Sequence, residues 1–237
     1  MEQETEKKPI IMCIGDSLAL PGHGNRFEDT WFSKLQIQFP DYLFASHFKR
    51  AITSYVLVSE GGGDSNFPGG ADCLEFYLPE IVVVQLGIVD CAPRYLKRQK
   101  KTTKILEAMP SKIKNLVYRL IKQLKKRSVK NADVSPIHFF HFWEVYLQRC
   151  QKNNVKKVII IKICTPDDTI NKKSPDMLQA IEMYNKIIDE IVGKFDFVTS
   201  IDPLGSGEKK IYDDGYHPNK YGNELVFQEL KKEINLV

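Results

Sequence analysis

The stretch Ile81–Leu86, IVVVQL, is almost entirely apolar and rich in β-branched side chains. Such a run is typical of a strand that is buried on both faces, as the central strands of a parallel sheet are. The same character returns at Val155–Ile163 (VKKVIIIKI) and at Pro9–Ile14 (PIIMCI), which ends just before a glycine. These three runs predict strands of one buried parallel sheet.

Two further strands and several helices surround these runs. One strand is expected between residues 42 and 58, preferably at Ser54–Val58, and the last strand at Phe197–Ile201. Residues at helical spacing predict helices at Asp29–Phe39 (with Asp29 as N-cap), Met177–Val192 and Asn223–Lys232. Strands that alternate with helices predict an α/β fold in which helices cover both faces of a parallel sheet.

Length and composition favour one globular domain over residues 1–237. The chain has 43% hydrophobic and 27% charged residues, which argues against a disordered or collagenous protein. Its 5 cysteines are scattered without a CxxC pair, so we expect reduced thiols and neither a disulfide framework nor a metal site. The first ten residues, MEQETEKKPI, lack an apolar signal-peptide core, and no apolar run reaches membrane-spanning length. A cytoplasmic protein, or one peripheral to the inner membrane, is therefore expected.

The net charge of +4 conceals a segregation of charge along the chain. Residues 94–130 hold fourteen Lys or Arg and a single acid, Glu107, so this segment carries +13 and the remainder −9. Apolar residues recur there at three- and four-residue spacing, which predicts an amphipathic pair of helices broken or kinked at Pro110.

Three interpretations of this basic segment stay open. It could form a lid with a solvated basic face, a helix on an anionic membrane surface, or a docking site for an acidic glycan, a phosphate-bearing substrate or a partner protein. Nucleic acid is not expected as a partner, because the segment has few interleaved aromatic residues and no known binding motif.

Polar motifs follow the expected strands, at the sheet edge where α/β proteins bind ligands. They are Gly15-Asp16-Ser17-Leu18, the glycine block at 61–65, Gly87-Ile88-Val89-Asp90 and Asp214-Gly215-Tyr216-His217-Pro218. Ser17 would need a base to act as a nucleophile, and His217 can supply it if the fold brings the two together. Asp214 can orient the imidazole, and backbone N–H groups of Ser17 and a glycine of the 61–65 block can stabilise an oxyanion.

These motifs resemble those of the GDSL, or SGNH, hydrolase superfamily. The resemblance runs from GDSL at 15–18 to DxxHP at 214–218, in the family's order and near opposite ends of the chain. It implies a three-layer, flavodoxin-like α/β/α fold with five parallel strands in the order 2-1-3-4-5. The basic segment 94–130 would then be a helical insertion between strands 3 and 4. The resemblance also implies hydrolysis of esters or thioesters by a Ser-His-Asp triad, without a metal or organic cofactor.

The resemblance assigns a role to each matching residue. Ser17 would be the nucleophile and an oxyanion donor, His217 the general base and then acid, and Asp214 its orienting partner. Gly63 would be the second oxyanion donor, with Gly61, Gly62 and Gly70 as alternatives. Asp90 would make structural hydrogen bonds beside the substrate site.

One position departs from the family pattern. The third block is usually GxND, whose Asn side chain is a third oxyanion donor, but here that position is Val89. Either Arg94 substitutes for the missing donor, or two backbone donors suffice, or the site is a poor hydrolase put to another use. Residues 87–94 also resemble a subgroup of uncharacterised bacterial members associated with surface-polysaccharide gene clusters.

The combined expectation is a hydrolase that removes an O-acyl group, for instance O-acetyl, from a carbohydrate or glycolipid intermediate. Its partners would be a small-molecule or glycan ester and, through residues 94–130, an anionic membrane surface. Two alternatives remain: an O-acyltransferase with the same triad, and a non-catalytic membrane or assembly adaptor that uses the basic helix.

Overall fold

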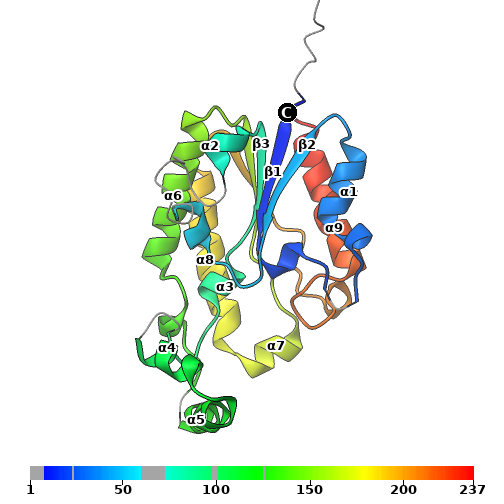
Figure 1. The fold of residues 1–237 in the computed structure, drawn as a ribbon. Coiled ribbons are helices and arrows are strands. Elements are labelled where there is room, and N and C mark those ends of the chain that lie inside the picture. Colours follow the sequence, from blue (N-terminus) through cyan, green and yellow to red (C-terminus); the bar gives the residue numbers. More distant parts are fainter. Residues whose placement is uncertain (1–7, 23, 60–72, 98–100, 125) are drawn as a thin grey trace, which may run out of the picture.

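A computed structural model of the chain describes residues 8–22, 24–59, 73–97, 101–124 and 126–237. Five strands form one parallel sheet in the order β2-β1-β3-β4-β5, which confirms the predicted topology (Figure 1). The strands are β1 (Ile10–Gly15), β2 (Leu43–Phe48), β3 (Ile81–Gln85), β4 (Lys157–Ile161) and β5 (Val198–Ile201).

The second strand lies elsewhere than Ser54–Val58, so that prediction is wrong. β2 pairs with β1 in parallel register from Ile10↔Leu43 to Gly15↔Phe48. Its sequence, LFASHF, is only half-buried because β2 is an edge strand, so it lacks the continuous apolar run of an inner strand. Residues 54–57 form a 3-10 turn instead. This turn buries Val56 and Leu57 and packs against helix α6 (Pro136–Lys152).

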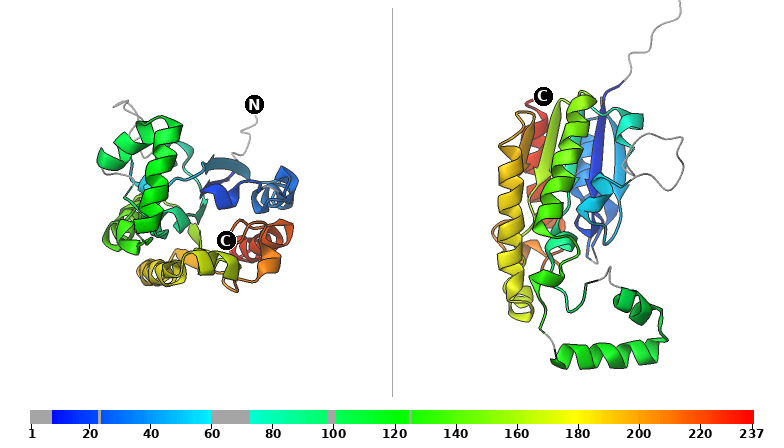
Figure 2. Two further views of the ribbon diagram at one scale, coloured as in Figure 1. Left: turned by 90° about the horizontal axis from the view of Figure 1, so that it is seen from below. Right: turned by 90° about the vertical axis from the view of Figure 1, so that its left-hand side faces the viewer.

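Helices cover both faces of the sheet. α1 (Trp31–Gln38) and α9 (Lys220–Ile234) pack together on one face, and α6 (Pro136–Lys152) and α8 (Asp176–Val192) on the other (Figures 1 and 2). The short helices are α2 (Leu74–Tyr77), α3 (Ile88–Cys91) and α7 (Asp168–Lys173). α3 and α7 lie beyond the carboxyl ends of the strands, where the turn with Ser17, directly after β1, also lies (Figure 1).

Helix starts follow local hydrogen bonding, which corrects one predicted cap. Thr30, and not Asp29, caps α1, because its Oγ1 accepts a hydrogen bond from the backbone N–H of Ser33. Asp29 belongs to the preceding 3-10 turn. In α8, four residues at helical spacing are buried and face the core: Ile181, Tyr184, Ile188 and Ile191.

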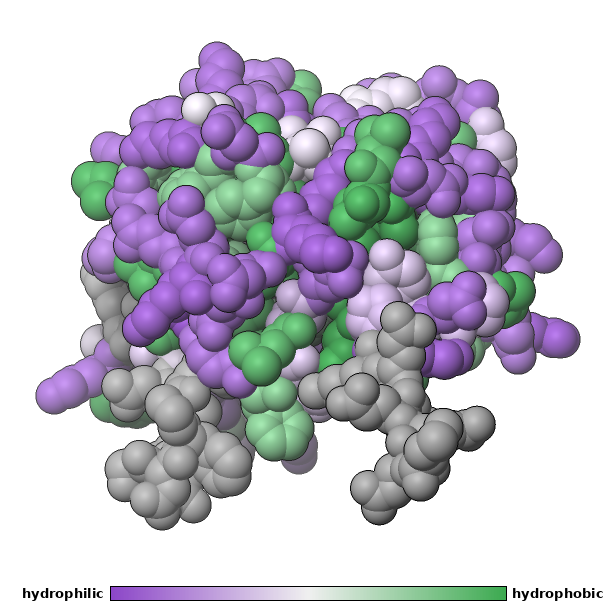
Figure 3. All heavy atoms as spheres, turned by 90° about the horizontal axis from the view of Figure 1, so that it is seen from above, coloured by the Kyte–Doolittle hydropathy of each residue, from purple (hydrophilic) through white to green (hydrophobic). Residues whose placement is uncertain are grey.

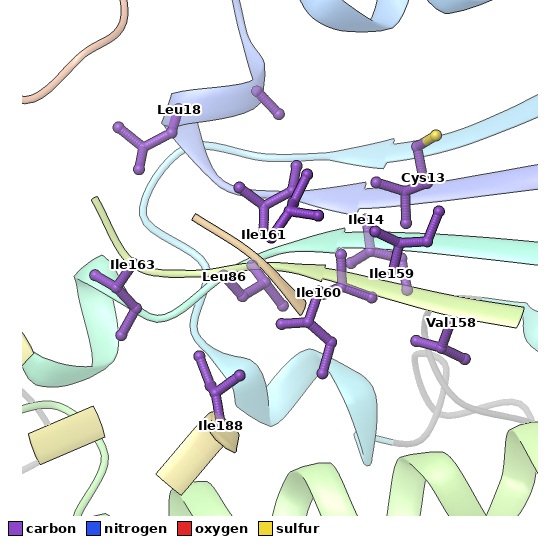
Figure 4. Close-up of a cluster of buried hydrophobic side chains, with 14 of the residues drawn as sticks. Cys13, Ile14, Leu18, Leu86, Val158, Ile159, Ile160, Ile161, Ile163 and Ile188 are labelled. Atoms are coloured by element: carbon purple, nitrogen blue, oxygen red, sulfur yellow. The ribbon is translucent and has the colours of Figure 1, made fainter. Parts of the chain in front are cut away.

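The core occupies both sides of the sheet. All five residues of β3 are buried, and the β4 side chains Ile159 and Ile160 are completely inaccessible to solvent. In Figure 4, Ile159 lies close to Ile14 of β1, and Ile160 points to the side of the sheet on which Ile188 of α8 lies. Each such side chain stabilises the fold by about 1.5–3 kcal/mol relative to its exposed state, so the sheet centre is a rigid support for the loops at its edge.

The basic segment forms α4 (Lys101–Ala108) and α5 (Ser111–Leu124), between β3 and β4 in the chain. Its two ends meet in a neck, where Arg94 and Ser128 exchange backbone hydrogen bonds of 3.2 and 3.0 Å. Beyond the neck, the helices extend away from the carboxyl end of the sheet (Figures 1 and 2). Glu107 of α4 accepts hydrogen bonds from Lys114 Nζ and from the Tyr118 hydroxyl of α5. Glu107 therefore joins the two helices.

The predicted apolar stripe of the segment is largely uncovered. Leu106 of α4 is buried, whereas no residue of α5 is.

At the opposite end of the molecule, where the strands begin, the coloured surface is mainly hydrophilic with scattered apolar groups (Figure 3). Within the described ranges, no helix has both the length and the apolar character needed to cross a bilayer.

Candidate active site

The turn after β1 is built around a glycine and an aspartate. A Cβ on Gly15 would lie 2.6 Å from the Cβ of Ala19, so only glycine allows the chain to turn this tightly. Oδ1 of Asp16 accepts a hydrogen bond of 2.9 Å from the backbone N–H of Leu18. Ser17 therefore starts a 3-10 turn directly beyond the sheet edge.

The loop before α9 brings the second half of the site to the same edge. The backbone N–H of Asp213 donates to the carbonyl of His217 at 2.9 Å, which closes the loop. Gly215 within it has φ +102°, and a Cβ there would lie 2.6 Å from Ile170. A left-handed glycine thus allows the loop to turn back, so that the side chain of Asp214 reaches His217.

The structure brings Ser17, His217 and Asp214 together. His217 Nε2 lies 3.0 Å from Ser17 Oγ, and His217 Nδ1 lies 2.8 Å from Asp214 Oδ2. The backbone N–H of His217 also donates to Asp214 Oδ1 at 3.0 Å. Because an ionised carboxylate only accepts hydrogen bonds, Nδ1 carries the proton, and Nε2 of the neutral ring accepts from the Ser17 hydroxyl.

The surroundings of Asp214 favour its ionised form. Burial raises the pKa of Asp214, but hydrogen bonds from the backbone and the imidazole of His217 outweigh it, so the pKa lies below its usual value. Asp214 is therefore a carboxylate at neutral pH. A carboxylate at this distance stabilises positive charge on the imidazole when the ring takes up a proton.

Two nearby carboxyl groups behave differently. Burial raises the pKa of Asp16 to about 7 and that of Asp90 to about 6. Asp90 Oδ1 accepts from the backbone N–H and the hydroxyl of Ser54, at 2.8 and 2.5 Å. It is completely buried and is not among the residues that line the cavity beside Ser17. Asp90 thus fastens α3 to the segment after β2 instead of facing a substrate.

Ser17 and His217 open onto a cavity of about 450 Å³. One part of its lining is apolar and comes from α3, α7 and the start of α8: Ile88, Val89, Ala92, Ile170 and Met177. The other part is polar or aromatic: Arg50, Arg94, Tyr95, Arg127 and Tyr216. A cavity of this size and mixed lining is typical of a small-molecule site.

The predicted oxyanion groups have different outcomes. Gly63, with the rest of the glycine block, lies outside the described residues. Val89 lines the cavity with an apolar side chain in the place of the family's Asn. Arg94 also lines the cavity, but its Nη2 donates to Asp133 Oδ2 at 2.9 Å and contacts the carbonyl of Val89 at 3.4 Å. Arg94 is thus held by an ion pair instead of projecting freely toward Ser17.

Sequence reasoning missed several cavity residues, among them the polar or aromatic side chains of Arg50, Tyr95 and Arg127. Arg127 is one of fourteen basic residues in its segment, and nothing in the pattern sets it apart. Arg50 follows β2, whose position was predicted wrongly, and it precedes Ala51, which has φ +61°. Arg50 lies just beyond the carboxyl end of β2, at the sheet edge where ligands bind. Had β2 been placed correctly from the sequence, this position would have marked Arg50 as a candidate site residue.

No family model matches the chain, and no curated protein matches it. Solved structures resemble it over nearly its whole length. A lipase/acylhydrolase from Enterococcus faecalis has a TM-score of 0.60 and 14% identity, covering 95% of each chain. An acetyl xylan esterase from Geobacillus stearothermophilus has a TM-score of 0.59 and 15% identity, covering 95% of this chain and 94% of the other.

A third similar structure carries the motif in its family name. It is a member of the lipolytic protein G-D-S-L family from Veillonella parvula, with a TM-score of 0.51, 11% identity, and coverage of 94% of this chain and 96% of the other. At these identities the likeness concerns the fold. The chain therefore has the fold of the GDSL-type, or SGNH, hydrolases.

Proposed function

We propose that the protein is a serine acyl-ester hydrolase. The observation that carries the proposal is the continuous contact from Ser17 through His217 to Asp214 beside a partly apolar cavity. A serine hydroxyl is a weak nucleophile by itself and becomes effective when an adjacent base removes its proton. The neutral tautomer of His217 presents that base at hydrogen-bonding distance.

Acylation of the enzyme is the first half of the reaction. Ser17 Oγ attacks the carbonyl carbon of the ester while its proton passes to His217 Nε2. Asp214 stabilises the resulting imidazolium. The backbone N–H of Ser17 donates to the oxyanion, and we assign Gly63 as the second donor by its match to the family's glycine block.

Collapse of the first tetrahedral intermediate leaves an acyl-enzyme, and hydrolysis of the acyl-enzyme completes the cycle. His217 gives its proton to the leaving alcohol oxygen, and the acyl group stays on Ser17 Oγ. In deacylation, His217 takes a proton from water while the water oxygen attacks the acyl carbon. The second tetrahedral intermediate then collapses as His217 returns this proton to Ser17 Oγ, which releases the carboxylic acid and restores free Ser17.

For the substrate, we propose an O-acyl ester of a carbohydrate or glycolipid, with a short acyl group such as acetyl. The apolar wall formed by Ile88, Val89 and Met177 supports binding of the acyl group. The likeness to an acetyl xylan esterase is consistent with a carbohydrate alcohol.

Ser17→Ala tests the proposal directly. We expect it to lower kcat for para-nitrophenyl acetate at least about a thousandfold and to abolish labelling by a fluorophosphonate probe. The control is Ser206→Ala, which removes the hydroxyl of a serine that does not line the cavity. Wild-type protein that is neither labelled nor active in a Ser17-dependent manner would contradict the proposal. Acylation of an added sugar acceptor in preference to water would identify an O-acyltransferase.

A further inference from the structure

The cavity beside Ser17 has an uneven charge. Among its described lining residues there are three arginines, Arg50, Arg94 and Arg127, and no aspartate or glutamate. An ester bond itself is neutral, so the proposed reaction at Ser17 gives no reason for this excess of positive charge. The arginines come from separate segments, the loop after β2 and the two sides of the neck, which the fold brings to one opening.

Two of the three arginines are available to a ligand. Arg94 is neutralised by its ion pair with Asp133. Arg50 and Arg127 are exposed, and neither forms an ion pair with another residue in the part of the chain that the structure describes. The Arg127 guanidinium lies over the ring of Tyr95, 5.3 Å from its centroid, which restricts its position at the cavity wall.

We propose that Arg50 and Arg127 bind an anionic group, a carboxylate or a phosphate, on the alcohol portion of the substrate. The inference rests on the proposed function and narrows its substrate class. A guanidinium forms paired, charge-assisted hydrogen bonds with both anions, and a cavity lined by one sign of charge concentrates oppositely charged ligands. The apolar wall with Ile88 and Met177 then holds the acyl group at Ser17.

The experiment compares para-nitrophenyl acetate with its analogue that carries a carboxylate on the ring. We expect the wild type to favour the anionic ester in kcat/KM, and Arg50→Gln/Arg127→Gln to lower the anionic-to-neutral ratio at least tenfold, mainly through KM. The matched control is Lys49→Gln/Lys126→Gln, which removes two adjacent exposed charges that do not line the cavity. The control should retain the wild-type ratio.

A binding measurement on Ser17→Ala protein separates this inference from the proposed function. Calorimetry with para-hydroxybenzoate and para-hydroxybenzamide should show tighter binding of the anion, and the arginine variant should lose that difference. Inorganic phosphate as competitor then distinguishes a phosphate site from one for carboxylates. Equal binding of the two ligands, or an equal loss in the lysine control, overturns the inference even if hydrolysis is confirmed.

A second inference comes from a different feature, the uncovered face of α5. Its stripe is formed by Ile113, Leu116, Leu120 and Leu124, which are 51%, 56%, 48% and 83% exposed. An apolar stripe of about three helical turns that stays about half exposed or more along its length is costly in water, so it favours an apolar environment outside the chain.

The charged residues around the stripe of α5 indicate what this apolar environment is. Helical periodicity places Lys112 and Lys114 at opposite edges of the apolar stripe. It places Arg119 and Lys122 on the side of α5 that faces away from the stripe. Glu107 is the one acid in the whole segment 94–130. Positive charge on both edges of an apolar stripe suits a flat, anionic lipid surface. It disfavours a second copy of α5, because two such helices would repel each other.

We propose that α5 lies in the interface of an anionic membrane, with its apolar stripe among the acyl chains and its lysines among the headgroups. The neck connects this helix to the cavity, since Arg94, Tyr95 and Arg127 belong to its two sides. The cavity would then open near the membrane surface.

Vesicle co-sedimentation tests the membrane inference. We expect binding to vesicles of mixed phosphatidylglycerol and phosphatidylcholine at about 0.1 M salt, and weak binding to phosphatidylcholine alone. Leu116→Glu/Leu120→Glu should weaken the binding at least tenfold, and so should Lys112→Glu/Arg119→Glu. The matched controls are Ile37→Glu/Ile137→Glu and Lys152→Glu/Lys186→Glu, which make the same changes at exposed positions outside the segment.

Insertion also has a direct spectroscopic readout. The two native tryptophans, Trp31 and Trp143, are buried, so a blue shift of Leu120→Trp emission on adding anionic vesicles reports the stripe itself. Absence of vesicle binding at low salt overturns the inference. So does binding that depends on Lys112 and Arg119 but not on Leu116 and Leu120, or a dimer that depends on Leu116 and Leu120 in solution.

Discussion

Asp16 stands at the turn that presents Ser17, and its carboxyl group is completely buried. Oδ1 accepts a hydrogen bond from Leu18, whereas Oδ2 has no partner among the described residues. Burial raises its pKa from 3.8 to about 7, so the folded protein keeps a proton that the unfolded chain has lost. The unfolded state binds fewer protons over this range, and the free energy of unfolding therefore decreases as the pH rises from about 4 to about 7.

We predict that Asp16→Asn removes this pH dependence. The amide Oδ1 can still accept from Leu18, and no charge has to be buried at high pH. The slope contributed by Asp16 is at most about 1.4 kcal/mol per pH unit. Urea unfolding at pH 5 and pH 7 should show the variant gaining stability relative to the wild type at the higher pH. Parallel pH profiles would contradict the burial of an ionisable Asp16.

Val89 places an apolar side chain at the position where the family has an oxyanion donor. Removing such a donor from other enzymes costs about 10²–10³ in kcat. We predict that Val89→Asn raises kcat for para-nitrophenyl acetate at least tenfold with little change in KM, because the new hydrogen bond forms in the transition state. Val89→Leu is the control, since it changes shape without adding a donor. An unchanged or lower kcat for Val89→Asn would show that the two backbone donors already satisfy the oxyanion.

At the scale of elements, α9 supports the loop that carries His217. A Cβ on Gly222, in the first turn of α9, would lie 2.4 Å from the backbone carbonyl oxygen of Ile211. Backbone cannot move aside as a flexible side chain can, so Gly222→Ala should push the helix start away from the loop.

We predict that Gly222→Ala lowers the free energy of unfolding by about 1–3 kcal/mol and lowers kcat further than stability alone accounts for. Gly193→Ala, at the end of α8, is the matched control, because a Cβ there has its nearest contact at 3.6 Å. Chemical denaturation and esterase assays measure both effects. If the two variants behave alike, α9 does not depend on this close approach.

At the scale of the whole molecule, the fold has a self-contained sheet and an appended helical pair. α5 buries no residue, and the neck is closed by the Arg94–Ser128 bridge. We predict that replacing residues 97–126 with a short Gly-Ser turn leaves a folded protein whose Tm lies within about 5 °C of the wild type. Thermal denaturation followed by circular dichroism measures this. Insoluble or unfolded protein would show that the segment belongs to the structural core.

Several parts of the fold were predictable for local reasons. β3 and β4 were recognisable because a strand buried on both faces must be apolar throughout. β2 was misplaced because an edge strand is half-exposed, so LFASHF carries no such signal, while Val56 and Leu57 are buried from a 3-10 turn. Asp29 resembled a cap as well as Thr30 does, and only the backbone path of the turn distinguishes them.

The residue pattern alone was enough to place the buried inner strands and to identify the residues that meet at Ser17. Glycine, carboxylate and histidine at fixed spacings leave few chemical alternatives, and parallel strands bring their carboxyl ends to one edge. Three features became visible only in the folded chain: Asp133 neutralises Arg94, Arg50 and Arg127 share one cavity, and α5 leaves its apolar face uncovered. The physical reason is that charge pairing and burial depend on which distant segments become neighbours, and local residue patterns do not encode those contacts.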